Sequence, residues 1–114
     1  MTQGIVDFND WQKLELRVGK IIEVSDIEGA DKLYKFTVDL GSKIGKRTIC
    51  AGIKEHYSKK DLKGKKISVF VNLEPKKLRG IESQGMILAA CTDDESKVIL
   101  VTPEKDIEIG SRIY

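Results

Sequence analysis

The sequence predicts an all-β fold of five or six short strands with one short helix among them. Two observations predict it. Apolar and polar residues alternate along several segments, which is the pattern of strands that bury one face. Polar, glycine-containing segments separate these strands, as turns do. At 114 residues the chain is long enough for one domain with a real core, and we expect residues 1–114 to form that domain.

A short helical turn is expected near the N-terminus. Phe8, Trp11 and Leu14 recur at three-residue spacing, and Asn9 or Asp10 stands near the predicted helix start. Trp11 is the largest apolar side chain in the sequence, so we expect it to plug one end of the core. Stacking on a base is the alternative for this residue.

The first two strands follow from alternation. A long first strand begins at Leu14, and one face of it is formed by Leu14, Leu16, Val18, Ile22 and Val24. Gly19 lies inside this strand, where a glycine often marks a bend or a bulge. Residues 27–32 are expected to form a loop, and the second strand then runs from Tyr34 to Leu40.

A hairpin over residues 41–45 leads to the third strand, one face of which carries Ile49, Ala51 and Ile53. A short helix is expected after it. Ser58 followed by Asp61 three residues later predicts the helix start, and Gly64 predicts its end.

The remaining strands are expected over residues 66–73, 86–91 and 97–101, the second of them apolar on both faces. With the helix between the third and fourth strands, this layout predicts an OB-fold, a five-stranded Greek-key barrel. Residues 1–13 and 102–114 are then N- and C-terminal extensions. Another small barrel or a sandwich stays open, because strand count does not fix topology.

A predicted loop rich in cations, residues 72–86, joins the fourth and fifth strands. Pro75 restricts its backbone, while Gly80 and Gly85 allow turns or close backbone approach. Its polar side chains include Asn72, Lys76, Lys77, Arg79, Ser83 and Gln84. This set suits the binding of phosphates and sugars, with little that could make or break bonds. Phe70 precedes the loop as a base-stacking candidate, or as a cover for a small cluster or a dimer contact.

Charge is distributed unevenly. The net charge is +2, yet residues 54–79 hold nine basic and three acidic residues, so the rest of the chain is net acidic. One basic region on a bipolar surface is expected for a nucleic-acid binder. A solvated lysine-rich face is the alternative explanation.

Several other functions are disfavoured. Cys50 and Cys91 lie in strand-like segments and are expected to be reduced core residues; neither has a cue for an activating base, which argues against a hydrolase. His56 is the single histidine and is expected on the surface, so with no Cys-x-x-Cys pair we expect no metal and no other cofactor. No apolar run approaches the roughly 20 residues that cross a bilayer. The prediction is a cytoplasmic protein with no membrane partner and no small-molecule substrate.

Three segments resemble the tRNA-binding domain family. They are Leu16-Arg17-Val18-Gly19-Lys20-Ile21, Ala30-Asp31-Lys32-Leu33-Tyr34 and the whole of residues 72–86, so the resemblance extends over nearly the whole chain. This family includes free-standing homodimeric proteins, C-terminal domains or beta subunits of methionyl-tRNA synthetases, and cytokine-like tRNA-binding cofactors. The resemblance implies an OB-fold that grips tRNA by its shape and backbone without reading an anticodon.

Site residues follow from the resemblance position by position. It implies tRNA contacts at Lys32, Asn72, Arg79, Ser83 and Met86, with phosphates supported by Lys76 and Lys77. In the OB-fold layout, the positive surface is extended by outward positions at Arg17, Lys35 and Thr37, and Gln84 lies beside Ser83. Met86 is either a flexible apolar contact, a pin for Ser83 and Gln84, or an ordinary core residue. Glu74 departs from the family pattern, where a basic or neutral residue is expected.

The implied function is non-catalytic. A tRNA-binding module raises the effective concentration of tRNA near methionyl-tRNA synthetase, either as its C-terminal module or as its beta subunit. The implied partners are tRNA, a second copy of the chain in a homodimer, and this synthetase. The alternative is a homodimeric peptide-binding export chaperone on the same fold, against which the Lys-Lys-x-Arg and Ser-Gln-Gly-Met elements argue.

Overall fold

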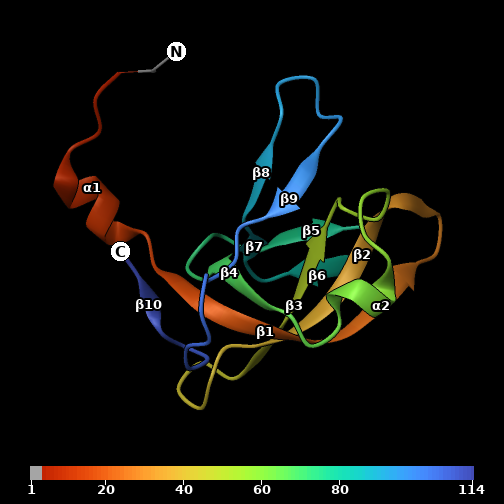
Figure 1. The fold of residues 1–114 in the computed structure, drawn as a ribbon, viewed down its shortest axis with the longest axis horizontal. Helices are drawn as coiled ribbons and strands as arrows, with labels where there is room; N and C mark the ends of the chain where they lie inside the picture. The colour runs from red at the N-terminus through yellow and green to blue at the C-terminus, as the bar shows by residue number, and fades with distance from the viewer. Residues whose placement is uncertain (1–3) are drawn as a thin grey trace.

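The computed structural model describes residues 4–114, so residues 1–3 of the predicted N-terminal extension lie outside it. Strands dominate this part of the chain (Figure 1). They are β1 (Leu16–Ile27), β2 (Ala30–Asp39), β3 (Lys46–Ala51), β4 (Lys66–Phe70), β5 (Lys76–Leu78), β6 (Ile81–Ser83), β7 (Met86–Ile87), β8 (Ala89–Cys91), β9 (Val98–Leu100) and β10 (Arg112–Ile113). Two short helices are described, α1 (Phe8–Lys13) and α2 (Lys59–Leu62). The predicted all-β class is confirmed.

The main sheet is antiparallel with the order β3-β2-β1-β4-β7, and β10 pairs with the start of β1. Its two ends approach each other, because the backbone N–H of Gln84, just before β7, donates to the carbonyl of Thr48 on β3 at 2.8 Å. A complete five-stranded barrel stays a prediction. The curved sheet encloses the core and brings the chain around residue 84 against β3.

The core follows from the alternation in the sequence. On β2, the side chains of Tyr34, Phe36 and Val38 are buried on one face, and they meet Ile49 of β3 and Val69 of β4. Burying an aliphatic or aromatic side chain of this size stabilises a fold by about 1.5–3 kcal/mol. The inner face of β2 is therefore the centre of the fold.

Gly19 has a packing role in β1, where a bend or bulge was expected. A Cβ at this position would lie 2.7 Å from Cγ1 of Val38 and 3.0 Å from Cδ2 of Leu40, so glycine leaves room for these core side chains. The pairing of β1 with β2 instead shifts register between Ile21 and Glu23. The predicted loop over residues 27–32 is also wrong, because β1 and β2 continue to a tight turn at Glu28 and Gly29.

The helix between β3 and β4 is confirmed. Ser58 caps α2, and its Oγ accepts a hydrogen bond from the N–H of Asp61 at 3.3 Å. Leu62 is fully buried in the core. Gly64 has a positive φ of 89°, and its N–H donates to the carbonyl of Ile21 at 2.8 Å. This connection therefore ends one helix and fastens it to β1.

The N-terminal helix is present, but Trp11 does not plug the core. Asp7 caps α1 through the N–H of Asn9, and no residue of the helix is buried. Trp11 is 37% exposed, and α1 stands away from the sheet (Figure 1). Leu62 of α2 and Leu100 of β9 belong to the core that forms without it.

The predicted fourth and fifth strands are shorter than expected. The fourth ends at Phe70, and the fifth divides at Leu88 into β7 and β8. β8 leaves the main sheet and pairs with β9 in a hairpin that projects from the body (Figure 1). Cys91 is exposed on it, so the prediction that both cysteines are core residues holds only for buried Cys50; both thiols are free.

Neither of the helices described is long and apolar enough to cross a membrane.

Candidate nucleic-acid interface

Residues 72–86, expected as a loop, contain the β5–β6 hairpin. Its register pairs Lys76 with Ser83, Lys77 with Glu82, and Leu78 with Ile81. The two turn residues, Arg79 and Gly80, both have positive φ, 53° and 81°. This is the backbone of the two-residue turn that suits the twist of paired strands. Arg79 adopts it at a cost of about 1–2 kcal/mol, because a Cβ disfavours left-handed backbone.

An apolar contact holds the hairpin against the sheet. Leu78 and Ile81 pack on a small cluster formed by Ile27, Ala30 and Cys50, beside the β1–β2 turn and β3. This contact places the hairpin tip next to the start of β2. As a result, Arg79 and Lys32 line the same hollow, together with residues 29–31 and 33.

The base of the hairpin is fixed by hydrogen bonds. Ser83 is buried, and its Oγ accepts from the N–H of Cys50 at 2.9 Å and donates to the carbonyl of Gly85 at 3.3 Å. Gly85 has a φ of 129°, and a Cβ there would lie 2.9 Å from the carbonyl oxygen of Phe70. The segment from Ser83 to Gly85 therefore holds the base of the hairpin against β3 and β4. Both hydrogen bonds of the Ser83 hydroxyl are made within the domain.

Asn72 joins the site to the N-terminal segment. Its Oδ1 accepts from the N–H of Glu15 at 2.8 Å, and its Nδ2 donates to the carbonyl of Lys13 at 2.7 Å. Both ends of the amide are thus occupied by backbone groups. Asn72 fixes the chain between α1 and β1 to the beginning of the cationic segment.

Some lysines of the basic region of the sequence form ion pairs within the described residues, and others do not. Around α2, Lys54 and Lys59 both pair with Asp26, at 3.1 and 2.5 Å, and Lys63 lies 3.6 Å from Glu23. Hydrogen bonds from Lys59 and then Lys54 hold the pKa of Asp26 below its ordinary value.

The cations of the hairpin and its neighbourhood form no ion pairs with any residue that the structure describes. Within residues 4–114, no carboxylate lies within 4.0 Å of the charged nitrogens of Lys32, Lys35, Lys76, Lys77 or Arg79. Neighbouring strand residues point to opposite faces, so Lys77 shares the outer face with Glu82, while Lys76 shares the face of Leu78 and Ser83. The exposed lysines therefore extend from both faces of the hairpin.

Lys35 lies beside this surface. On β2 it is paired with Cys50 of β3, which is part of the cluster under the hairpin. Burial raises the pKa of the Cys50 thiol, and the charge of Lys35 opposes that shift. Thr37, also predicted to extend this surface, is half-buried two pairs further along β2.

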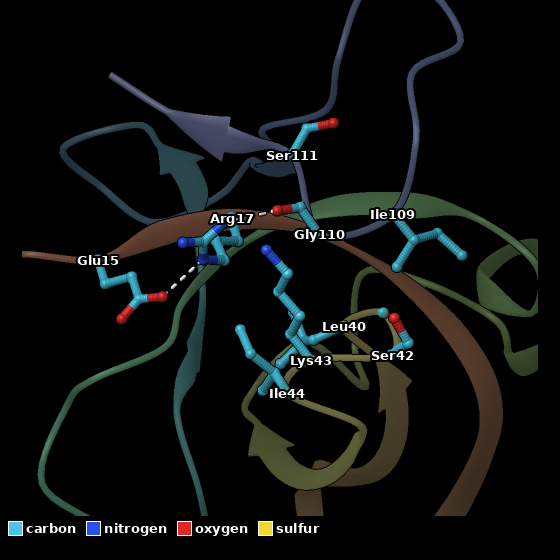
Figure 2. Close-up of a pocket in the computed structure, with 10 residues that line it drawn as sticks. Glu15, Arg17, Leu40, Ser42, Lys43, Ile44, Ile109, Gly110 and Ser111 are labelled. Carbon is cyan, nitrogen blue, oxygen red and sulfur yellow. Dashed lines mark hydrogen bonds and ion pairs between the residues drawn. The ribbon is translucent and has the colours of Figure 1, made fainter.

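Arg17 lies in a different hollow, which has a volume of about 460 Å³ (Figure 2). Its Nε donates to Glu15 Oε2 at 2.6 Å and its Nη1 donates to the carbonyl of Gly110 at 2.7 Å. Figure 2 shows Lys43 reaching toward the same place from the β2–β3 turn. The structure therefore does not bring Arg17 into the hollow that Lys32 and Arg79 share.

Met86 and Gln84 lie at the end of the segment. Met86 pairs with Phe70 across β4 and β7 and is 44% exposed, so it is not an ordinary core residue. Phe70 is half-buried. Gln84 lines a further hollow with Arg47 and residues 71–75.

Arg47 is a residue that the sequence analysis missed. Its Nη1 donates to the carbonyl of Val71 at 2.6 Å, which holds the guanidinium beside the cationic segment. The sequence indicated this role only weakly. Arg47 lies on the same face of the third strand as Ile49, but it is outside the basic stretch of residues 54–79.

Fold and site together define a class of protein. A small all-β domain that holds a hairpin with exposed Lys76, Lys77 and Arg79 against its sheet has the features of a binding module for polyanions such as nucleic acids. Residues 16–112 match the family described as "Putative tRNA binding domain". The chain belongs to this tRNA-binding domain family.

Relatives and solved structures agree with this assignment. The chain is 54% identical over 108 residues to the methionine–tRNA ligase of Thermococcus onnurineus, covering 95% of this chain but 14% of that protein. Its fold matches the crystal structure of a MetRS-related protein from Pyrococcus horikoshii with a TM-score of 0.90 and 36% identity, covering 98% and 100% of the two chains. The CsaA chaperone protein from Picrophilus torridus matches with a TM-score of 0.87 and 38% identity, covering 96% and 100%.

Proposed function

We propose that this domain binds folded tRNA without catalysing a reaction, and that the β5–β6 hairpin with Lys32 forms the main contact. One observation carries the proposal: Arg79 and Lys32 line one hollow, and although Asp31 also lines it, neither cation forms an ion pair within residues 4–114. A guanidinium clamps a phosphate through two parallel hydrogen bonds, while an ammonium acts as a point charge.

A rigidly held hairpin can select an RNA by the shape of its folded backbone. Asn72 and Ser83 use their polar groups inside the domain, so we assign them to fixing the hairpin and not to direct contact with RNA. The cations on both faces of the hairpin are then held at set positions. Phosphates of a folded RNA that match these positions bind without ordering the protein first.

The domain serves methionyl-tRNA synthetase in this proposal, as a C-terminal module or as a separate beta subunit. The methionine–tRNA ligases that it resembles are much longer, and this chain spans about 14% of their length. Attachment or association of a tRNA-binding domain raises the local concentration of tRNA at the enzyme. The expected result is a higher apparent tRNA affinity with unchanged chemistry.

A homodimer is also proposed. Phe8, Trp11 and Leu14 lie exposed along the N-terminal segment, and Tyr114 is 91% exposed at the other end of the chain. Phe8, Trp11, Leu14 and Tyr114 line one hollow together with Arg112, so the two terminal segments form a common apolar surface. A second copy of the chain that pairs through the same surface would cover it.

A second candidate function is a peptide-binding export chaperone, and the 38% identity to a CsaA chaperone protein favours it. The two functions differ in their dependence on salt. Binding to tRNA through about four phosphate contacts should weaken with a log–log slope of roughly −3 to −4. Titration with tRNA and with an unfolded polypeptide over a range of salt decides between them: polypeptide binding that survives high salt, without tRNA binding, would establish the chaperone.

A further inference from the structure

A hollow of about 390 Å³ lies at the base of the cationic hairpin, where the chain leaves β4 and approaches β5. Part of its lining is apolar and comes from Val71, Leu73 and Pro75. Two other lining side chains, Glu74 and Gln84, are polar. Pockets of a few hundred Å³ with apolar walls and a few polar groups are typical of small-ligand sites.

The walls of this hollow are fixed before any ligand arrives. Arg47 is anchored to the carbonyl of Val71 at 2.6 Å, and the backbone of Gln84 is anchored to Thr48 at 2.8 Å. Asn72 is held by two hydrogen bonds to the segment that precedes β1. Pro75 restricts its own φ. These contacts fix part of the wall, while the exposed side chain of Glu74 would be ordered by the ligand.

Three polar groups in the hollow are uncommitted. Within residues 4–114, the carboxylate of Glu74 and the side-chain amide of Gln84 have no hydrogen-bond or ion-pair partner, and Arg47 uses Nη1 alone. Glu74 repels phosphates next to Lys76, so its position is better explained as an acceptor for N–H groups.

Guanine is the RNA base that can bind both the Glu74 carboxylate and the Arg47 guanidinium. Its N1–H and exocyclic N2 amino group stand side by side and can donate to one carboxylate, while O6 and N7 accept from a guanidinium. Adenine, cytosine and uracil do not present two donors and two acceptors in this arrangement. Sequence-dependent recognition of RNA commonly uses unstacked bases that lie against side chains in this way.

We propose that this hollow binds one unstacked guanine of the RNA, with Glu74 accepting from N1–H and the N2 amino group and Arg47 donating to O6 and N7. The proposal rests on the proposed function, because it takes the ligand to be RNA. Leu73 and Pro75 contact the base, and Lys76, which follows Pro75 directly, meets the adjacent phosphate. The acidic residue that weakens backbone binding thus provides a preference for a base.

The experiment compares three fluorescent pentaribonucleotides, UUGUU, UUAUU and UUIUU, where I is inosine and lacks the N2 amino group. Wild-type protein should bind UUGUU about tenfold more tightly than UUAUU, with UUIUU between them. E74Q removes one negative charge, so it should bind UUAUU more tightly than wild type while its preference for guanine falls to about twofold or less. Loss of charge alone would raise the affinity for all three oligonucleotides equally and would leave the preference for guanine unchanged.

E82Q is the matched control, because Glu82 is exposed on the outer face of the same hairpin and outside the hollow. It should raise the affinity for all three oligonucleotides equally and keep the preference for guanine. Equal binding of the three by wild type, no detectable binding of any of them, or a preference that persists in E74Q would overturn the guanine site even if folded tRNA still binds. Failure of wild type to bind tRNA at all would overturn the proposed function itself.

Discussion

The side chains of Lys32 and Arg79 line one hollow between the β1–β2 turn and the tip of the β5–β6 hairpin. They are brought together by an apolar contact, since Leu78 and Ile81 of the hairpin pack on Ile27 and Ala30. Two cationic residues thus line one hollow, and neither forms an ion pair within the described residues, although Asp31 lines the hollow as well. The buried apolar surface of this contact holds the hairpin tip beside the start of β2.

Two substitutions of Arg79 should separate the effect of its charge on tRNA binding from the effect of its backbone conformation on stability. R79A should weaken tRNA binding by about ten- to a hundredfold, because charge-assisted hydrogen bonds contribute roughly 1.5–3 kcal/mol. It should also reduce the salt slope by about one. R79G should lose the same affinity but keep or increase its stability, because glycine tolerates the positive φ of 53°. Anisotropy titrations and chemical denaturation measure these effects; unchanged affinity in both variants would remove Arg79 from the interface.

Lysines with and without an ion pair should contribute differently to tRNA binding. The double variant K76A/K77A should weaken tRNA binding and lower the salt slope by about two, because both ammonium groups are free to meet phosphates. The control is K59A/K63A, which removes the same charge from α2, where Lys59 pairs with Asp26 and Lys63 with Glu23. Filter-binding titrations at several salt concentrations compare them. Equal losses in the two variants would indicate that only net charge matters.

Ser83→Ala should act through stability. The change leaves the N–H of Cys50 without its partner at 2.9 Å, and an unsatisfied buried donor costs about 1–3 kcal/mol. Urea denaturation measures this loss. Affinity for tRNA should fall only as far as the hairpin becomes mobile, which amide exchange on β5 and β6 reports. A variant of unchanged stability with much weaker tRNA binding would instead make Ser83 a direct contact.

The apolar terminal surface should control assembly. F8D/W11D places two charges on α1, whose residues contribute nothing to the buried core. We expect sedimentation at micromolar concentration to show dimers for wild type and monomers for this variant, both with the same near-native circular dichroism. Wild type that sediments as a monomer would contradict the homodimer.

Asp26 should contribute to the acid dependence of stability. Its pKa is lowered in the folded protein by Lys59 and Lys54, relative to an ordinary value of 3.8. A lowered folded-state pKa stabilises the fold above the ordinary pKa, and that contribution disappears as the pH falls through the folded-state pKa. D26N should therefore be less stable than wild type at about pH 6 and equally stable at about pH 2, in urea unfolding series. A difference that does not change with pH would mean that the ion pairs contribute nothing.

Part of the fold could be predicted because local patterns and tertiary packing agree. The alternation of Tyr34, Phe36 and Val38 gives the inner face of β2 correctly, and Ser58 and Gly64 mark the helix between β3 and β4. Trp11 was placed wrongly, because size and apolarity alone do not show whether a side chain faces its own core or lies exposed on a terminal segment. Cys91 was placed in the core for the same reason, and it is exposed.

The candidate site could be predicted in its composition but not in its arrangement. The sequence by itself determined the strand periodicity, the helix caps and the cationic segment, because these depend on neighbours along the chain. Only the tertiary structure decided that Arg79 and Lys32 line one hollow, that Arg17 belongs to another hollow, and that Lys54, Lys59 and Lys63 form ion pairs. Contacts between segments far apart in sequence depend on the packing of the whole sheet, and that packing leaves no local periodic signal in the sequence.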